Sequence, residues 1–146
     1  MNIARHIALI DELCFRPFPA ERRRSDFGVE GPGYHVAVLD SSQGLADCDC
    51  GVRATTVEQY EKDRDALYEL LAPRWGHTDP LSLQTTLLRT DREEIPEPWA
   101  SFSADARMTY LWEVEGTGRW LAVAVADRNT SDEVRLLAVV TEIDPP

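Results

Sequence analysis

Apolar side chains near the start of the chain recur at the spacing of a helix, every three or four residues. They are Ile3, Ile7, Ile10 and Cys14. This pattern places them on one face and predicts an amphipathic helix over residues 2–14. Two prolines within residues 15–19, "FRPFP", then favour an extended connector, because proline restricts itself and the residue before it. Alternating apolar and polar side chains predict a strand over residues 34–40, "YHVAVLD".

A second helix is predicted over residues 56–72. Thr55 and Glu58 have the spacing of a capping box, in which each side chain satisfies a backbone donor at a helix start. Pro73 is expected to end the helix. The side chains expected on its inner face are Val57, Tyr60, Leu67, Leu70 and Leu71. Those expected to face water are Glu58, Glu61, Lys62, Asp63, Asp65 and Glu69.

Strand patterns dominate the second half of the chain. Residues 83–89 predict one strand, and three more are predicted over residues 108–115, 119–127 and 134–143. The last three are joined by short glycine-containing or polar turns, so they are expected to form an antiparallel meander. The chain is therefore predicted to be a single α+β domain over residues 1–146. Its sheet is expected to be mainly antiparallel, with the helices packed on one face.

The predicted strand at residues 119–127 avoids charge on both of its faces. One face carries Trp120, Ala122, Ala124 and Ala126, and the other carries Leu121, Val123 and Val125. Such a strand is central and covered on both sides. The alanine face suits the close approach of a helix, and the valine face suits a second layer or a partner. Trp120 and the nearby Trp112 are interpreted as packing residues and not as a ligand cage.

The net charge of the chain restricts its partners. A formal charge of −11 over 146 residues repels phosphate backbones and anionic lipid, and it attracts basic surfaces. Nucleic acid and membranes are therefore not expected as direct partners. No run approaches the roughly 20 apolar residues that span a bilayer, and the start of the chain lacks a small-residue cleavage site. These features lead us to expect a cytoplasmic protein.

Residues 41–53 are expected to form a polar loop, which contains the run "DCDCG". Cys48 and Cys50 could bind a metal together with the neighbouring acids and His35 or His77. Tetrahedral zinc sites, however, usually show a C-x2-4-C pair together with a second matching pair of ligands, and the sequence contains no such second pair. We interpret the two cysteines as reduced thiols and predict no metal site.

The other candidate residues have simpler interpretations. Cys14 lies on the apolar stripe of the first helix, which is typical of a small buried residue. The basic run Arg22–Arg24 is interpreted as neutralised by the protein's own carboxylates or as a solvated loop. The three histidines have no HExxH or triad spacing. Gly116 and Gly118 lie in a hairpin and open no helix, so they do not form a dinucleotide fingerprint. We predict no catalytic residue and no cofactor.

Three segments occur in order along the last two-thirds of the chain: "YEKDRDALYELLAPRWG", "IPEPW" and "LWEVEGTGRWLAVAVADRNTSDEVRLLAVVTEIDPP". This order resembles a group of small actinobacterial proteins with a helix that ends in R-W-G and a hairpin with W-x-V and R-W. The resemblance implies a fold and no activity. By architecture and charge alone, a small acidic α+β protein is similar to bacterial immunity proteins, and such a likeness does not establish function.

The first functional hypothesis is a non-enzymatic interaction protein, of the immunity or antitoxin type, whose acidic surface binds a basic protein partner. The candidate contact residues are Glu58, Glu61, Asp65, Glu69, Glu93, Glu94, Asp132 and Glu133. The alternative interpretation is that the acidic surface serves only to keep the protein soluble, which explains the same net charge.

Two alternatives belong to other classes. One is a small enzyme or ligand-binding protein with an aromatic-lined pocket between the sheet and the helices. Its lining would be Tyr60, Trp75, Trp99, Trp112 and Trp120, with His77 or Tyr110 as a polar group. The other is a regulatory adaptor or homodimer that uses the valine face of the strand at residues 119–127.

Overall fold

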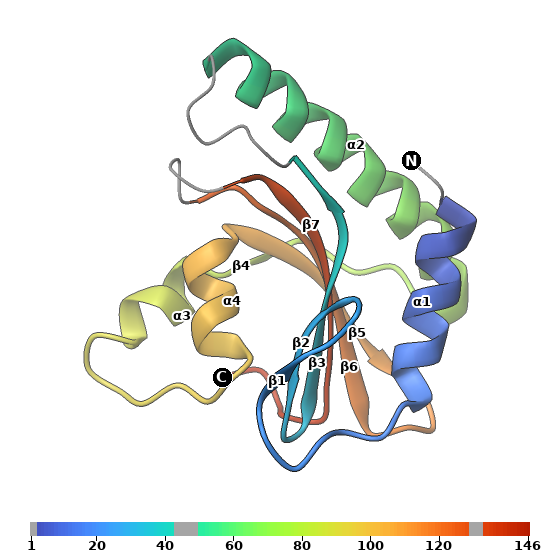
Figure 1. The fold of residues 1–146 in the computed structure, drawn as a ribbon, viewed down its shortest axis with the longest axis vertical. Coiled ribbons are helices and arrows are strands. Elements are labelled where there is room, and N and C mark those ends of the chain that lie inside the picture. Colours follow the sequence, from blue (N-terminus) through green and yellow to red (C-terminus); the bar gives the residue numbers. More distant parts are fainter. Residues whose placement is uncertain (1–2, 43–49, 129–132) are drawn as a thin grey trace.

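The computed structural model describes residues 3–42, 50–128 and 133–146. Across these residues, four helices and seven strands build an α+β fold, which confirms the predicted class (Figure 1). In chain order the elements are α1 (Ile3–Phe15), β1 (Arg23–Arg24), β2 (Gly28–Gly31), β3 (Tyr34–Ser41), α2 (Cys50–Trp75), β4 (Leu81–Ser82), α3 (Gln84–Arg89), α4 (Trp99–Asp105), β5 (Met108–Val114), β6 (Arg119–Ala126) and β7 (Arg135–Thr141).

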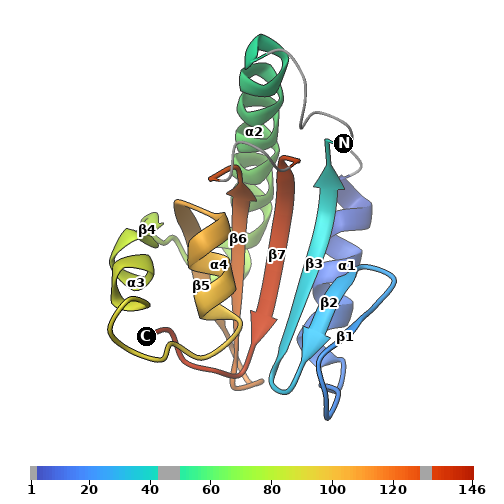
Figure 2. The same ribbon diagram turned by 60° about the vertical axis from the view of Figure 1, so that its left-hand side comes forward.

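The strands form one sheet in the order β1-β2-β3-β7-β6-β5-β4, and neighbouring strands are antiparallel. Strands β5, β6 and β7 are the predicted C-terminal meander. Strand β3 comes from the first third of the chain and pairs with β7, from Tyr34 opposite Thr141 to Ser41 opposite Arg135. Strands β3, β7 and β6 therefore lie side by side in Figure 2, and the N-terminal third is part of the same sheet.

Strand β6 is covered on both faces, as its sequence predicts. Leu121 and Val123 point into a core cluster with α1 and α2, whereas Ala122 and Ala124 point into a second cluster with α4. Figure 1 shows α1 and α2 on one side of the sheet and α3 and α4 on the other. The prediction that the helices pack on one face is therefore wrong. A strand that is apolar on both sides needs a covering layer on each.

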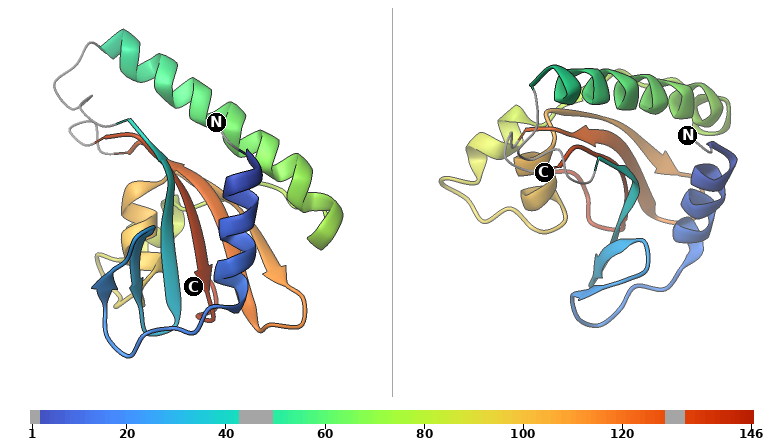
Figure 3. Two further views of the ribbon diagram at one scale, coloured as in Figure 1. Left: turned by 45° about the vertical axis from the view of Figure 1, so that its right-hand side comes forward. Right: turned by 45° about the horizontal axis from the view of Figure 1, so that its top comes forward.

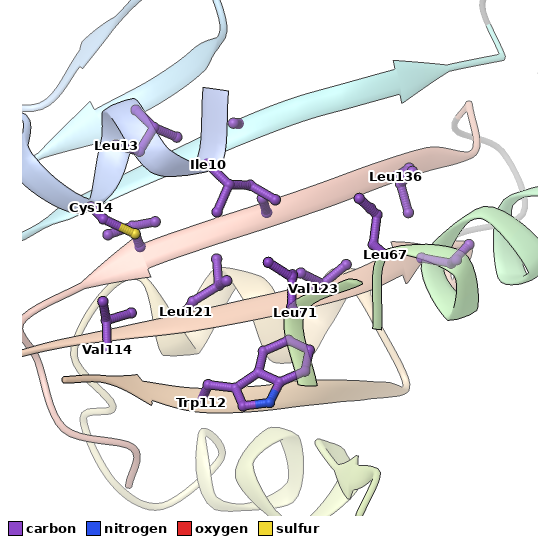
Figure 4. Close-up of a cluster of buried hydrophobic side chains, with 14 of the residues drawn as sticks. Ile10, Leu13, Cys14, Leu67, Leu71, Trp112, Val114, Leu121, Val123 and Leu136 are labelled. Carbon is purple, nitrogen blue, oxygen red and sulfur yellow. The ribbon is translucent and has the colours of Figure 1, made fainter. Parts of the chain in front are cut away.

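The larger core cluster lies between the sheet and the two longer helices. In Figure 4, α1 contributes Ile10 and Leu13 and α2 contributes Leu67 and Leu71, and all four side chains are fully buried. Cys14 lies in the same cluster, which confirms its interpretation as a buried residue. Burial raises the pKa of its thiol to about 11, so the thiol is uncharged and a poor nucleophile at neutral pH.

Helix α2 begins earlier than predicted. Its first residue is Cys50, so the polar loop predicted over residues 41–53 overlaps the helix, and residues 43–49 lie outside the described part of the chain. Thr55 is not a cap but an interior residue, and its hydroxyl donates to the Gly51 carbonyl at 3.0 Å. The predicted capping box is therefore wrong.

Helix α2 also continues beyond Pro73, which lies inside its last turn. The residue that ends it is Gly76, whose φ of 101° is in the left-handed region that favours glycine. The Gly76 N–H donates to the Ala72 carbonyl at 2.7 Å and closes the helix. Near this end, Leu70 was predicted on the inner face, but its side chain is 48% exposed.

Residues 84–89 form α3, where a strand was predicted. The side chains that this segment buries are Leu83 and Thr86, with Leu87 half-buried, and they are three to four residues apart. That spacing is helical, so the short helix presents one side to α4 and the sheet.

Candidate functional site

Four of the predicted contact residues lie along one side of α2. They are Glu58, Glu61, Asp65 and Glu69, and all four are exposed. Their spacing of three, four and four residues aligns them along one stripe of a helix, which we call the α2 acidic stripe. Lys62 lies within this stripe, and its ammonium nitrogen is 3.7 Å from a carboxylate oxygen of Glu58. One cation is therefore set among four carboxylates.

Asp65 differs from the three glutamates of the stripe because it contacts neighbouring elements. Its carboxylate accepts a hydrogen bond from Nε of Arg64 at 3.1 Å and another from the Tyr110 hydroxyl at 3.3 Å. Burial and the charge of Asp65 raise the pKa of Tyr110. Asp65 thus contributes to local packing, whereas the glutamates project from the surface of the helix.

The other predicted contact residues lie elsewhere. Glu93 and Glu94 are on the connection between α3 and α4, across the sheet from α2 (Figure 1). Arg89 donates two hydrogen bonds to the Glu93 carboxylate, at 2.8 and 2.9 Å, and this pairing lowers the pKa of Glu93. Glu133 is half-buried just before β7, and Asp132 lies outside the described residues. One partner surface therefore cannot cover the whole predicted set.

The aromatic residues that were predicted to line one pocket are divided between two cores. Trp99 belongs to the cluster on the α4 side of the sheet, whereas Tyr60 and Trp112 belong to the cluster under α1 and α2. Trp120 is half-buried and donates from its indole nitrogen to the Asp144 carboxylate at 3.1 Å. The prediction of a single pocket lined by all these rings is wrong.

Tyr68, which no sequence pattern singles out, is the centre of an aromatic cluster. Its ring centroid lies 4.5 Å from that of Tyr110 and 5.6 Å from that of Trp112. Its hydroxyl lies 3.4 Å from Nδ1 of His77. The indole N–H of Trp112 donates to the Gly76 carbonyl at 2.8 Å. These rings pack against one another, which confirms Trp112 as a packing residue.

The valine face of β6 is not available to a partner. Leu121, Val123 and Val125 are buried beneath α1 and α2. An adaptor or homodimer contact through this face, which the sequence left open, would require both helices to leave the sheet. Any self-association must therefore use a different surface.

A buried ionic cluster surrounds Glu30, whose side chain is 1% exposed. Glu30 pairs with His35 across the β2–β3 turn, and Nδ1 of His35 lies 3.0 Å from Oε1 of Glu30. Arg23 donates to Oε2 at 2.7 Å, and Nε of Arg16 lies 3.5 Å from Oε1. Burial acts to raise the pKa of Glu30, but the hydrogen bond and charge of Arg23, together with the charge of Arg16, hold it below its usual value. The interpretation of the basic run as neutralised by the protein's own carboxylates is confirmed for Arg23.

Both ring nitrogens of His35 face oxygen atoms that accept hydrogen bonds. Nδ1 faces Glu30, and Nε2 lies 3.2 Å from the carbonyl oxygen of Arg16. Burial lowers the pKa of His35, while these two oxygens act to raise it. The rings of Phe18 and Phe27 enclose the imidazole, with centroids 4.8 and 5.9 Å away. The cluster therefore links Arg16 and Phe18, in the connector after α1, to His35 on β3.

A cavity of about 510 Å³ lies between α1 and β3, which are neighbours in Figure 3. Helix α1 supplies Arg5, Leu9 and Glu12 to one wall, with His6 beside them, and Arg16 follows directly after the helix. The spacing of Arg5, Leu9 and Glu12 places them along one side of the helix, so this wall is mainly charged, with Leu9 as its apolar residue.

The opposite wall comes from β3 and from the residues before β2. It consists of Asp26, Phe27, Val38, Leu39 and Asp40. Strand β2 pairs with β3 only as far as Ala37, opposite Gly28. Within the described part of the chain, β3 has no strand neighbour on that side beyond this pair, and the cavity occupies the space.

His6 is buried in this cavity wall, with 7% of its surface exposed. Its Nε2 atom has no hydrogen-bond partner among the described residues. Burial lowers the pKa of His6, although the charges of Asp40 and Asp63 act to raise it. Asp63 was predicted to face water, but it is only 7% exposed and accepts a hydrogen bond from Gln59 at 2.9 Å.

Two other findings concern metal binding and membrane-spanning helices, neither of which the sequence predicts. No group of three or more His, Cys, Asp or Glu side chains within the described ranges could hold a metal ion. Among the helices that the structure describes, none has the length and apolar character needed to cross a membrane. Cys48 lies outside the described residues and the side chain of Cys50 is not described, so their interpretation as reduced thiols stays a prediction.

Comparison with protein-family models, with curated proteins and with solved structures gives no match to this chain. The resemblance to small actinobacterial proteins therefore stays a prediction, as does the likeness to immunity proteins. Function has to be inferred from the chain's own residues.

The ionic cluster around Glu30 predicts that replacing Glu30 destabilises the fold more than replacing the exposed Glu93. Glu30→Gln is expected to lower the free energy of unfolding by about 2 kcal/mol, because the buried amide has one oxygen and cannot accept hydrogen bonds from both Arg23 and His35. Glu93→Gln breaks only a solvent-exposed pair and is expected to have little effect. Urea unfolding of both variants measures the difference. Equal effects would show that the Glu30 cluster does not stabilise the fold.

The burial of His6 leads us to predict that the stability of the fold depends on pH. Because its pKa in the folded protein lies below its ordinary value of 6.5, the unfolded chain takes up the proton first, and stability falls as the pH drops below that value. One histidine contributes at most about 1.4 kcal/mol per pH unit. Urea unfolding between about pH 7 and about pH 5 is expected to show a smaller loss for His6→Gln than for the wild type. Identical pH profiles would refute this assignment.

Proposed function

We propose that this chain is a non-enzymatic binding protein whose α2 acidic stripe docks on a basic surface of a protein partner. The observation that carries the proposal is the alignment of four exposed carboxylates along one helix, in a chain of net charge −11. Carboxylates on a rigid helix present a fixed negative potential. Such a potential speeds the encounter with a positively charged partner and orients it.

Helix α2 is well placed to reach a partner. Its N-terminal half extends past the end of the sheet (Figures 1 and 3). The stripe from Glu58 to Glu69 spans about 16 Å at the rise of an α-helix, which is long enough to meet several basic side chains at once. The exposed Leu70 follows the last of these glutamates and offers an apolar contact of the kind that interfaces bury at their centre.

Within this class, the type of partner we propose is a nuclease-like toxin, which makes the chain an immunity or antitoxin protein. A protein that acts on nucleic acid carries a cationic surface that binds phosphates. An acidic helix is complementary to that surface and competes with nucleic acid for it. The support for this narrower proposal is the charge and the small α+β architecture.

Two variants with equal changes in net charge test the position of the docking surface. The stripe variant is Glu58→Gln, Glu61→Gln and Glu69→Gln, and the control variant is Glu21→Gln, Glu113→Gln and Glu115→Gln, at exposed positions outside α2. Affinity is measured for a partner captured by the wild type from a lysate of the organism that encodes the chain. At about 50 mM salt, the stripe variant is expected to bind at least about tenfold more weakly, and the control variant within about twofold of the wild type.

The captured partner is expected to be basic, and its binding is expected to weaken as salt is raised, because exposed charges are screened. Equal losses in the two variants would contradict the placement of the contact on α2. Binding that is insensitive to salt and to both variants would contradict the docking function itself.

A further inference from the structure

Lys62 is the only lysine of the chain. The sequence has 15 lysine and arginine residues, so arginine occupies every other one of these cationic positions. The single lysine lies on α2 within the α2 acidic stripe, about one helical turn after Glu58 and about one turn before Asp65. The chain therefore replaces its usual arginine with lysine at one position, and that position is inside the proposed docking surface.

The formation of an ion pair on the helix does not explain why this residue is a lysine. The ammonium nitrogen of Lys62 lies 3.7 Å from a carboxylate oxygen of Glu58, and both side chains are 70% exposed. Such a pair, at positions i and i+4, stabilises a helix only slightly. The chain uses arginine for a pair of the same spacing, between Arg89 and Glu93. An arginine at position 62 could therefore pair with Glu58 in the same way.

Lysine differs from arginine in having an amine that can be acylated. Acylation converts the ammonium group into a neutral amide, so the side chain loses its charge and can no longer form an ion pair. The guanidinium group of arginine, by contrast, stays charged. Because the side chain of Lys62 is exposed, its nitrogen is accessible to an acyl donor and to an enzyme that carries one.

Loss of the Lys62 charge changes the potential of the whole stripe. At the rise of an α-helix, the stripe extends from about 6 Å before Lys62 to about 11 Å after it. These distances are comparable to the screening length of about 10 Å at 0.1 M salt. The neighbouring Arg64 does not replace the lost charge at the surface, because its side chain is only 11% exposed and its guanidinium stacks over the Tyr110 ring at 5.5 Å.

We propose that Lys62 is an acylation site that regulates the α2 acidic stripe, with an acyl thioester as the acyl donor. The proposal rests on the docking function proposed above. The unprotonated amine of Lys62 attacks the carbonyl carbon of the thioester, the C–N bond forms and the C–S bond breaks. The thiol leaves with the proton that the amine loses, and no group is oxidised or reduced. The acylated stripe binds its basic partner more tightly than the unmodified stripe does.

Mass spectrometry of the protein isolated from the organism that encodes it tests the modification. A peptide that contains Lys62 and the added mass of an acyl group is expected, from growing or from stationary cultures. Purified wild type treated with acetyl-coenzyme A is expected to gain an acetyl group at Lys62, whereas Lys62→Arg gains none at this position. Absence of an acyl group on Lys62 from both kinds of culture overturns the proposal.

Binding to the captured partner tests the regulation. At about 50 mM salt, the acetylated wild type and Lys62→Gln, which carries a neutral amide, are expected to bind about threefold more tightly than the unmodified wild type. Lys62→Arg keeps the charge, so it is expected to bind as the unmodified wild type does, before and after treatment with acetyl-coenzyme A. Equal affinities of the unmodified wild type, the acetylated wild type and Lys62→Gln would refute the regulatory role.

The stripe variant separates this proposal from the docking function. If the stripe variant binds the partner more weakly and Lys62→Gln binds as the wild type does, the docking function stands and the role of Lys62 is refuted. If binding responds neither to salt nor to the stripe variant, the docking function itself has failed. The acylated residue then has no docking surface to regulate, whatever mass spectrometry finds.

Discussion

Strand β6 must be covered on both faces, and the rest of the architecture follows from this constraint. Its alanine face admits α4 closely, while Leu121 and Val123 meet the longer helices α1 and α2. A strand without polar side chains on either face is stable only where a layer covers each face of the sheet. Helices α1 and α2 form one of these layers and α4 forms the other, while β7 and β5 flank β6 within the sheet.

Several polar side chains that could otherwise bind a ligand already have hydrogen-bond or ionic partners within the protein. The indole nitrogens of Trp99 and Trp112 donate to backbone carbonyls, and Glu30 is paired with Arg16, Arg23 and His35. Two features lie outside this packing. The α2 acidic stripe is an exposed row of carboxylates on the helix surface. The cavity between α1 and β3 is a concave space lined by charged and apolar side chains.

Local periodicity makes α1 and the meander predictable, because their apolar positions repeat at the period of the element itself. The strand predicted over residues 83–89 is wrong because the apolar residues of this segment fit both an alternating and a helical pattern, and packing against α4 decides in favour of the helix α3. The pairing of Glu30 with His35 has a local signal, since the turn at Pro32 and Gly33 in "EGPGYH" places them opposite each other. The approach of Arg16 to Glu30 and the burial of Asp63 depend on tertiary packing that no local pattern records.

The most direct test of the two-sided core is the free energy of unfolding of Ala124→Leu, measured with urea. Ala124 is fully buried on the face that meets α4, so a larger side chain must displace that helix. The predicted result is a loss of about 2 kcal/mol relative to the wild type, with Ala104→Leu on the exposed side of α4 as the reference. An Ala124→Leu protein at least as stable as the wild type would contradict a closed alanine face.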